Sequence, residues 1–102
     1  MSVHKPTLVV TRRAQRDIGG LLRNTTQVWG PRQRDEYEAV LDRALETILE
    51  HPEIGKPRED IRASQRSFPV GEHIIYYRII GTTLRVDRVL HAKMDVRAQL
   101  GV

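Results

Sequence analysis

Three residues near the C-terminus combine charge, a titratable ring and a spacing that could serve a binding site: Arg88, His91 and Asp95. If residues 84–90 form a strand, side-chain alternation places Arg88 on the same face as neighbouring valine and leucine, where an unpaired charge is costly. Either a β-bulge changes the alternation near Arg88, or a specific acceptor holds its guanidinium close to the core. The expected acceptor is a carboxylate from the loop or from Asp95. A helix that begins near residue 91 would place His91 and Asp95 on one face, because they are four residues apart. These three residues form the first candidate site.

Enzymatic motifs are not evident elsewhere in the chain. The sequence has no phosphate-binding glycine loop, no His-x-x-x-His pair and no nucleophile motif. The carboxylates at positions 42, 46 and 50 recur at helical spacing, on what should be a solvated helix face. His73 stands at the start of a predicted strand, where a structural hydrogen bond is a commoner role for histidine than acid–base catalysis. We therefore expect no metal ion and no cofactor.

Length and composition fit one domain. The 102 residues include 39% hydrophobic side chains and no cysteine, so we expect a single domain over residues 1–102, with one core and no disulfides. No apolar run approaches the ~20 residues of a membrane span, and the first residues lack the apolar stretch of a signal peptide. We expect a soluble, cytoplasmic protein with no membrane contact.

The charges are unevenly distributed. Basic side chains outnumber acidic ones in residues 1–34 and 61–102, whereas acidic side chains dominate residues 35–60. This pattern permits binding to nucleic acid or to an acidic protein, and it equally fits solvated helix faces of alternating sign. A plain DNA-binding module would use arginines of the first helix to contact phosphates, but a base-reading face of Asn or Gln is not evident beside them. These arginines are Arg12, Arg13, Arg16 and Arg23.

The elements that must position these groups follow from two hydrophobic periods. Apolar residues recur every three or four positions up to His51 and alternate from Arg66 onward. Thr11 can cap the first helix, Gly30-Pro31 separates it from the second, and prolines predict a loop over residues 52–64. The predicted strands are residues 7–11 at a sheet edge, 66–70, 73–80 in the centre, and 84–90.

These elements define an α+β fold of order β-α-α-β-β-β-α. A helical hairpin packs on a small antiparallel sheet, and a short helix over residues 92–100 ends the chain. The predicted core between hairpin and sheet consists of Ile18, Leu22, Trp29, Tyr37, Leu41, Leu45, Ile48, Ile75, Tyr77 and Ile79. Alternation then places Ile74, Tyr76, Arg78 and Ile80 on the opposite face of their strand. A small domain rarely leaves such a patch open, so we expect a partner to cover it.

Several motifs occur together over residues 7–100. They are Trp29-Gly30, Tyr37, Pro52-x-x-Gly55-x-Pro57-Arg58, Ile61-Arg62, Arg66-Ser67-Phe68, Val70-Gly71-x-His73, Tyr76-Tyr77-Arg78 and Arg88-Val89-Leu90-His91-x-x-Met94-Asp95. With these motifs in this order, the chain resembles the ParE toxins of bacterial type II toxin-antitoxin modules, within the RelE/ParE superfamily. The fold that this resemblance implies agrees with the fold that periodicity predicts.

The resemblance implies a toxin that inhibits growth by poisoning DNA gyrase on its bound DNA, and that is not itself an enzyme. It also implies a cognate antitoxin of the ParD type as partner, and no small-molecule substrate. Because the terminal motif coincides with the break in alternation, it is the expected target-binding surface, formed by Arg88, His91, Met94 and Asp95. The alternative is that Arg88 and Asp95 only tie the last strand to the final helix. An extended or helical antitoxin segment is expected to lie across the outer strand face or along the helical hairpin, with its acidic groups reaching exposed arginines such as Arg78. The strand-face residues expected to bind it are Ile74, Tyr76, Arg78 and Ile80.

The RelE branch of the superfamily supplies the alternative function, a ribosome-dependent mRNA endoribonuclease. Such a nuclease places basic residues with a Tyr, His or Glu around the attacking 2′-hydroxyl and the phosphate. The residues that could take these roles are Arg62, Arg66, Arg78, Arg85 and His91. Residues 93–102 lack the tyrosine that is common there in RelE-type nucleases, so the sequence favours the gyrase-directed function.

Overall fold

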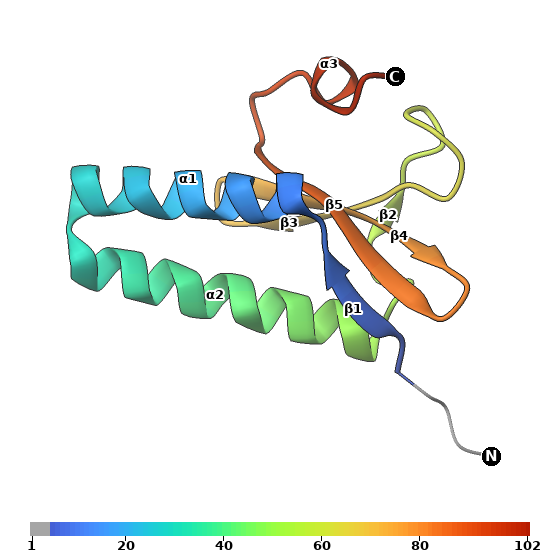
Figure 1. Cartoon of the computed structure of the whole chain (residues 1–102), viewed down its shortest axis with the longest axis horizontal. Coiled ribbons are helices and arrows are strands. Elements are labelled where there is room, and N and C mark those ends of the chain that lie inside the picture. The colour runs from blue at the N-terminus through green and yellow to red at the C-terminus, as the bar shows by residue number, and fades with distance from the viewer. Residues whose placement is uncertain (1–4) are drawn as a thin grey trace.

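The computed structural model describes residues 5–102, and it shows two long helices against one side of a sheet with a short helix on the other side (Figure 1). The elements are β1 (Thr7–Val10), α1 (Arg12–Trp29), α2 (Pro31–Glu50), β2 (Lys56–Pro57), β3 (Arg66–Val70), β4 (His73–Ile80), β5 (Thr83–His91) and α3 (Val96–Leu100). The predicted α+β class and the helical hairpin are confirmed. Within residues 5–102, no helix is both long enough and apolar enough to cross a lipid bilayer.

The strands form one sheet in the order β1-β5-β4-β3-β2. The predictions that β4 is central and that β1 lies at an edge are confirmed. Strands β2 to β5 pair antiparallel as predicted, whereas β1 runs parallel to β5 and makes the sheet mixed. No tight turn joins these two strands, since the helical hairpin and three other strands separate them in sequence, and parallel pairing is open to them. The predicted loop also contains β2, whose proline is tolerated at the sheet edge.

The ends of the two long helices follow the local sequence signals. The Thr11 side chain accepts a hydrogen bond from the Ala14 backbone N–H, so the predicted N-cap is confirmed. Gly30 adopts φ 93°, a conformation that favours glycine, and Pro31 begins α2 where its missing N–H costs nothing. The prediction that Trp29 is a core residue is wrong, because its exposed fraction is 73%. The hairpin tip, where α1 ends and α2 begins, extends beyond the sheet (Figure 1).

The main core lies between the hairpin and the sheet. Leu22, Leu41, Ile48, Ile75 and Tyr77 are buried there as predicted. The remaining predicted members are partly buried and pack against the same cluster: Ile18, Tyr37, Leu45 and Ile79. The core also contains residues outside the predicted list: Ala14, Leu21 and Ala44 from the apolar faces of the helices, and Val70, Leu84, Val86 and Val89 from the strands.

A second apolar cluster lies on the other face of the sheet. Ile61, Tyr76 and Leu90 are its buried members, and the side chains of Val96 and Leu100 of α3 pack against them. The prediction that a partner must cover Tyr76 is therefore wrong, because the chain's own loop and C-terminal segment already reduce its exposed fraction to 4%. The predicted C-terminal helix also begins later than expected, at Val96 rather than residue 92, because Asp95 caps it.

Candidate functional site

A β-bulge in β5 determines how the site is built. Tyr76 pairs with Arg88 and Tyr77 pairs with Val86, so Asp87 is the extra residue in the strand. The bulge shifts the alternation: Leu84 and Val86 face the main core before it, and Val89 faces the same core after it. Both alternatives raised by the sequence are realised, because the strand bulges and Arg88 also has specific acceptors.

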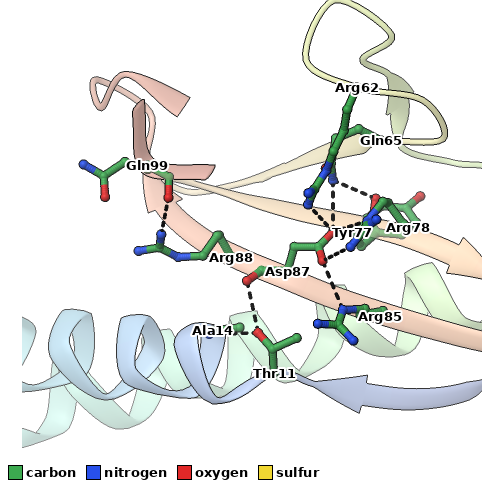
Figure 2. Close-up of polar contacts among 10 residues, drawn as sticks. All are labelled: Thr11, Ala14, Arg62, Gln65, Tyr77, Arg78, Arg85, Asp87, Arg88 and Gln99. Atoms are coloured by element: carbon green, nitrogen blue, oxygen red, sulfur yellow. Dashed lines mark hydrogen bonds and ion pairs between the residues drawn. The ribbon is translucent and has the colours of Figure 1, made fainter. Parts of the chain in front are cut away.

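Three arginines converge on the carboxylate of Asp87 (Figure 2). Arg78 of β4 donates two hydrogen bonds to it, at 2.8 and 2.9 Å. Arg85 lies 3.3 Å from one carboxylate oxygen, and Arg62 of the loop before β3 lies 3.3 Å from the other. Asp87 is itself buried, with an exposed fraction of 6%. We call Asp87 with Arg62, Arg78 and Arg85 the Asp87 cluster.

Gln65 connects the loop to the Asp87 cluster. Its side chain is buried, donates to the Tyr77 carbonyl at 3.0 Å and to Asp87 at 3.3 Å, and accepts from Arg62 Nε at 2.7 Å. The Tyr77 hydroxyl in turn accepts from the Gly55 N–H at 2.9 Å. A Cβ atom at Gly55 would lie 2.5 Å from that hydroxyl, so this close approach requires glycine. The loop that carries Arg62 is thus fastened to the sheet.

The charges of the Asp87 cluster do not balance. Burial acts to raise the pKa of Asp87, but the hydrogen bonds and charge of Arg78, followed by the charge of Arg62, outweigh it and leave the pKa below its ordinary value. Asp87 is therefore ionised at neutral pH, and it faces three guanidinium groups. The surplus positive charge is directed to solvent, most of all at Arg85, whose side chain is 47% exposed.

Arg88 belongs to a different arrangement. Its guanidinium donates to both carboxylate oxygens of Asp17, at 2.7 and 2.9 Å, and to the Gln99 carbonyl at 2.7 Å. Asp17 also accepts the Val89 N–H at 3.1 Å. The prediction that a loop carboxylate or Asp95 holds Arg88 is wrong, because the acceptor lies on α1. Arg88 fastens β5 to both α1 and the C-terminal helix.

The first candidate site, Arg88 with His91 and Asp95, is not assembled. The Asp95 carboxylate caps α3 by accepting from the N–H groups of Arg97 and Ala98, at 3.1 and 3.4 Å. His91 lies in β5 rather than in a helix, so the predicted four-residue spacing on one helical face does not apply. Its Nδ1 accepts the Lys93 N–H at 3.1 Å. Met94 lies between the end of β5 and the start of α3, and its side chain is exposed.

The residues of the alternative nuclease site are also separated. Arg62 and Arg78 lie in the Asp87 cluster, but Arg66 donates to the backbone carbonyls of Glu53 and Gly55, at 3.1 and 2.7 Å. His91 pairs with His73, the first residue of β4. Arg78 lies five residues further along β4, so about 17 Å separate it from the His73–His91 pair at the rise per residue of a strand. The structure therefore does not bring this histidine to the arginines.

The outer face of the sheet divides into two halves. Of the predicted antitoxin-binding residues, Tyr76 is buried and Ile74 packs against the second cluster, whereas Ile80 is half exposed and Arg78 is partly exposed. Val9 of β1 and Arg85 pair side by side on the same face as Arg78, and both are exposed. We call Val9, Arg78, Ile80 and Arg85 the open half. Its missed member Val9 was readable from alternation, because Leu8 and Val10 pack on the main core.

A polar network on the helix side was also missed. The Tyr37 hydroxyl lies 2.6 Å from His73 Nδ1 and donates to the Val70 carbonyl at 3.0 Å. The ring of His73 contacts that of His91 edge-on, with centroids 5.4 Å apart. Burial first, and then the charge of His91, lowers the pKa of His73 below its ordinary value. In residues 5–102, no three His, Asp or Glu side chains are gathered in a way that could hold a metal ion.

Comparisons with known families and sequences identify close relatives. Residues 8–96 match the family described as the ParE toxin of the type II toxin-antitoxin system parDE. The chain is 38% identical to Toxin ParE1 of Caulobacter vibrioides over 92 residues, which cover 90% of this chain and 95% of the relative. It is 37% identical to Toxin ParE1 of Mycobacterium tuberculosis H37Rv over 73 residues, 71% of this chain and 74% of the relative.

Two solved structures share the fold. A chain of the chromosomal ParDE toxin-antitoxin system from P. aeruginosa superposes with a TM-score of 0.77 at 15% identity, covering 89% of this chain and 100% of that one. A chain of the toxin-antitoxin complex RelBE2 from Mycobacterium tuberculosis superposes with a TM-score of 0.63 at 27% identity, covering 86% of this chain and 99% of that one.

Proposed function

The chain belongs to the ParE toxin family of type II toxin-antitoxin systems, within the RelE/ParE superfamily, and from this we propose that it inhibits growth by poisoning DNA gyrase. The observation that carries the proposal is the match of the ParE family over residues 8–96, nearly the whole described fold. The toxin acts in the cytoplasm, on gyrase with its bound DNA, and a cognate ParD-type antitoxin encoded beside it neutralises it.

The geometry of the basic residues supports an inhibitor rather than an enzyme. A nuclease needs a general acid or base within hydrogen-bond reach of the group that it serves. Here Arg62 and Arg78 bind the carboxylate of Asp87, and Arg66 binds backbone carbonyls. His91 lies in β5 beside the start of β4, away from Arg78. The histidine proposed as the general acid or base, His91, therefore does not stand beside these arginines.

A ribosome-dependent mRNA endoribonuclease is the second candidate function. The likeness to the RelBE2 chain, at 27% identity and a TM-score of 0.63, favours keeping it. If this function is correct, Arg62, Arg66, Arg78 and His91 must be brought together by the ribosome or the mRNA, because they are separate in the free chain.

For the antitoxin we propose the open half of the outer face. Val9 and Ile80 offer exposed apolar side chains, and Arg78 and Arg85 offer positive charge beside them. An antitoxin segment with alternating apolar and acidic side chains would satisfy both. Tyr76 and Ile74 support this surface from within the second cluster rather than contact the antitoxin directly.

For the target we propose the turn that follows β5. His91 and Met94 present accessible side chains there, and Met94 is half exposed. Arg88 and Asp95 then act as positioning residues, because Arg88 fastens the strand before the turn and Asp95 caps the helix after it.

The decisive experiment compares both targets in parallel. Purified toxin is added to gyrase with relaxed DNA to follow supercoiling, to gyrase with supercoiled DNA to follow cleavage, and separately to translating ribosomes with a defined mRNA. Gyrase poisoning predicts inhibited supercoiling and accumulation of cleaved DNA, with intact mRNA. Truncated mRNA together with normal gyrase activity would replace the proposal with the nuclease function.

A further inference from the structure

The fold holds two arginines directly opposite each other on the outer face. Arg78 of β4 pairs with Arg85 of β5, and like charges at directly opposite positions destabilise a sheet. Asp87 relieves this repulsion, and among the residues of β1, β4 and β5 it is the only carboxylate. The guanidinium groups of Arg62, Arg78 and Arg85 thus face a single carboxylate, and the Asp87 cluster keeps surplus positive charge.

The arginines keep donors available beyond their internal contacts. A guanidinium carries five N–H donors. Arg85 uses its Nε on Asp87, the only ion pair that it forms within residues 5–102, and nearly half of its side chain is exposed. Arg78 and Arg62 also retain partly exposed side chains. Asp87 and Gln65 fix the positions of these groups, which reduces the entropy that a ligand must pay to order them.

Positive charge continues from the Asp87 cluster to the start of α1. The Thr11 hydroxyl donates to the Asp87 carbonyl at 3.1 Å, so α1 begins beside the bulge (Figure 2). Arg12 and Arg13 follow at once and are exposed, and the first turn contains no acidic residue to offset them or the positive end of the helix dipole. The helix start that carries Arg12 and Arg13 therefore lies next to the strand that carries Arg85 and Asp87.

We propose that this region, Arg62, Arg78 and Arg85 with Arg12 and Arg13 beside them, binds the phosphates of a nucleic acid backbone. Planar guanidinium groups match phosphate oxygens in pairs. Two hollows of the described surface, one of about 920 Å³ around Pro6, Pro52 and Ile79, are lined by other residues. Arg85, Arg12 and Arg13 are exposed, and exposed cations suit an extended polyanion better than a small enclosed anion.

This inference goes beyond gyrase poisoning, which does not require the toxin itself to contact DNA. The proposed phosphate-binding region shares Arg78 and Arg85 with the open half, so an antitoxin bound to the open half would also block the phosphate contacts. The toxin thus has its own affinity for DNA, which the antitoxin removes.

The test measures binding of the purified full chain to a fluorescent duplex of about 20 base pairs by anisotropy, from about 50 to 200 mM salt, without gyrase. We expect binding that weakens steeply with salt. Arg85→Gln should lower the slope of log K against log salt by about 1 and weaken binding about three- to tenfold at low salt. Arg85→Lys, which keeps the charge, should retain most of the slope.

Arg32→Gln is the matched control, because it removes the same charge from an almost fully exposed side chain on α2. It should leave the binding nearly unchanged. Equal losses in Arg85→Gln and Arg32→Gln would overturn the proposal in favour of attraction by net charge alone. Absence of binding at low salt, or equally effective competition by polyglutamate of the same charge, would also overturn it. Since gyrase is absent from the assay, none of these results bears on gyrase poisoning.

Discussion

Residues 87 and 88 are neighbours in one strand, yet their ion pairs are opposite in kind. Arg88 meets one carboxylate, Asp17, with both side chains nearly buried, and the remaining donors reach the Gln99 carbonyl. Asp87 is also buried, but it meets three arginines whose outer parts remain exposed. The Arg88 pair is closed and balanced, whereas the Asp87 cluster is open and carries surplus charge. Charge balance, rather than burial alone, separates a structural ion pair from a candidate binding surface.

The largest expected effect comes from breaking the closed pair. Arg88→Ala leaves the Asp17 carboxylate nearly buried without its cation, so we expect a loss of about 3–5 kcal/mol in the free energy of unfolding. Urea denaturation of the purified variant measures this loss. Toxicity should fall with it, because fewer molecules are folded. A loss below about 1 kcal/mol would show that water or another cation replaces Arg88, and the pair would not be the structural element described here.

The second effect concerns Gln65, which connects the Asp87 cluster to the backbone of β4. Gln65→Leu preserves much of the side-chain volume but removes the donor to the Tyr77 carbonyl and the acceptor for Arg62. Leaving a buried carbonyl unsatisfied costs about 1–3 kcal/mol, a smaller loss than for Arg88→Ala. The measurement is again urea denaturation, with Gln99→Leu as control, because Arg88 uses only the backbone carbonyl at that position. Equal losses in the two variants would contradict the role of the Gln65 amide.

The contrast also explains what the sequence could predict. Helix starts, helix ends and the two hydrophobic periods depend on neighbouring residues, so Thr11, Gly30 and the core face of β4 followed from local patterns. The break in alternation correctly marked Arg88 as unusual. Its partner could not be found in the same way, because Asp17 lies 71 residues earlier and only the packing of α1 on β5 brings the two together.

The errors on the outer face have a similar cause. Alternation placed Tyr76 on the correct face of its strand, but it carries no information about which later segment folds back over that face. Likewise, Arg88, His91 and Asp95 are close in sequence, yet a strand end, a turn and a helix cap direct them to three different sets of partners. Gln65 gave no local signal, since its importance depends on contacts with β4 and β5.

The third prediction is that the contributions of the Arg88–Asp17 pair and the Asp87 cluster to stability do not change with pH near neutrality. The lowered pKa of Asp87 means that its stabilising charge is lost only as pH falls below about 4, the ordinary range of an aspartate. The lowered pKa of His73 has a different window: the unfolded chain takes up a proton below about 6.5 while folded His73 resists it, so stability falls as pH drops from 7 to 5.

Thermal unfolding at a series of pH values checks this assignment. His73→Gln should reduce the fall in melting temperature between pH 7 and 5, whereas Arg85→Gln should leave that fall unchanged. His51→Gln serves as the control, because His51 is exposed at the end of α2. An unchanged pH profile in His73→Gln would locate the responsible proton elsewhere.

The smallest expected effect on stability completes the comparison. Arg85→Ala removes a cation that is nearly half exposed, and Asp87 retains Arg78 at 2.8 Å and Arg62 at 3.3 Å. Exposed ion pairs contribute about 0–1 kcal/mol, so the free energy of unfolding should change by less than about 1 kcal/mol in the same urea assay that detects the large loss of Arg88→Ala. A nearly unchanged free energy of unfolding would show that folding does not need the charge of Arg85, which is what surplus charge means here. If Arg85→Ala instead costs as much as Arg88→Ala, Asp87 requires all three arginines, the cluster is closed like its neighbour, and no cation remains for an antitoxin carboxylate or a nucleic acid phosphate.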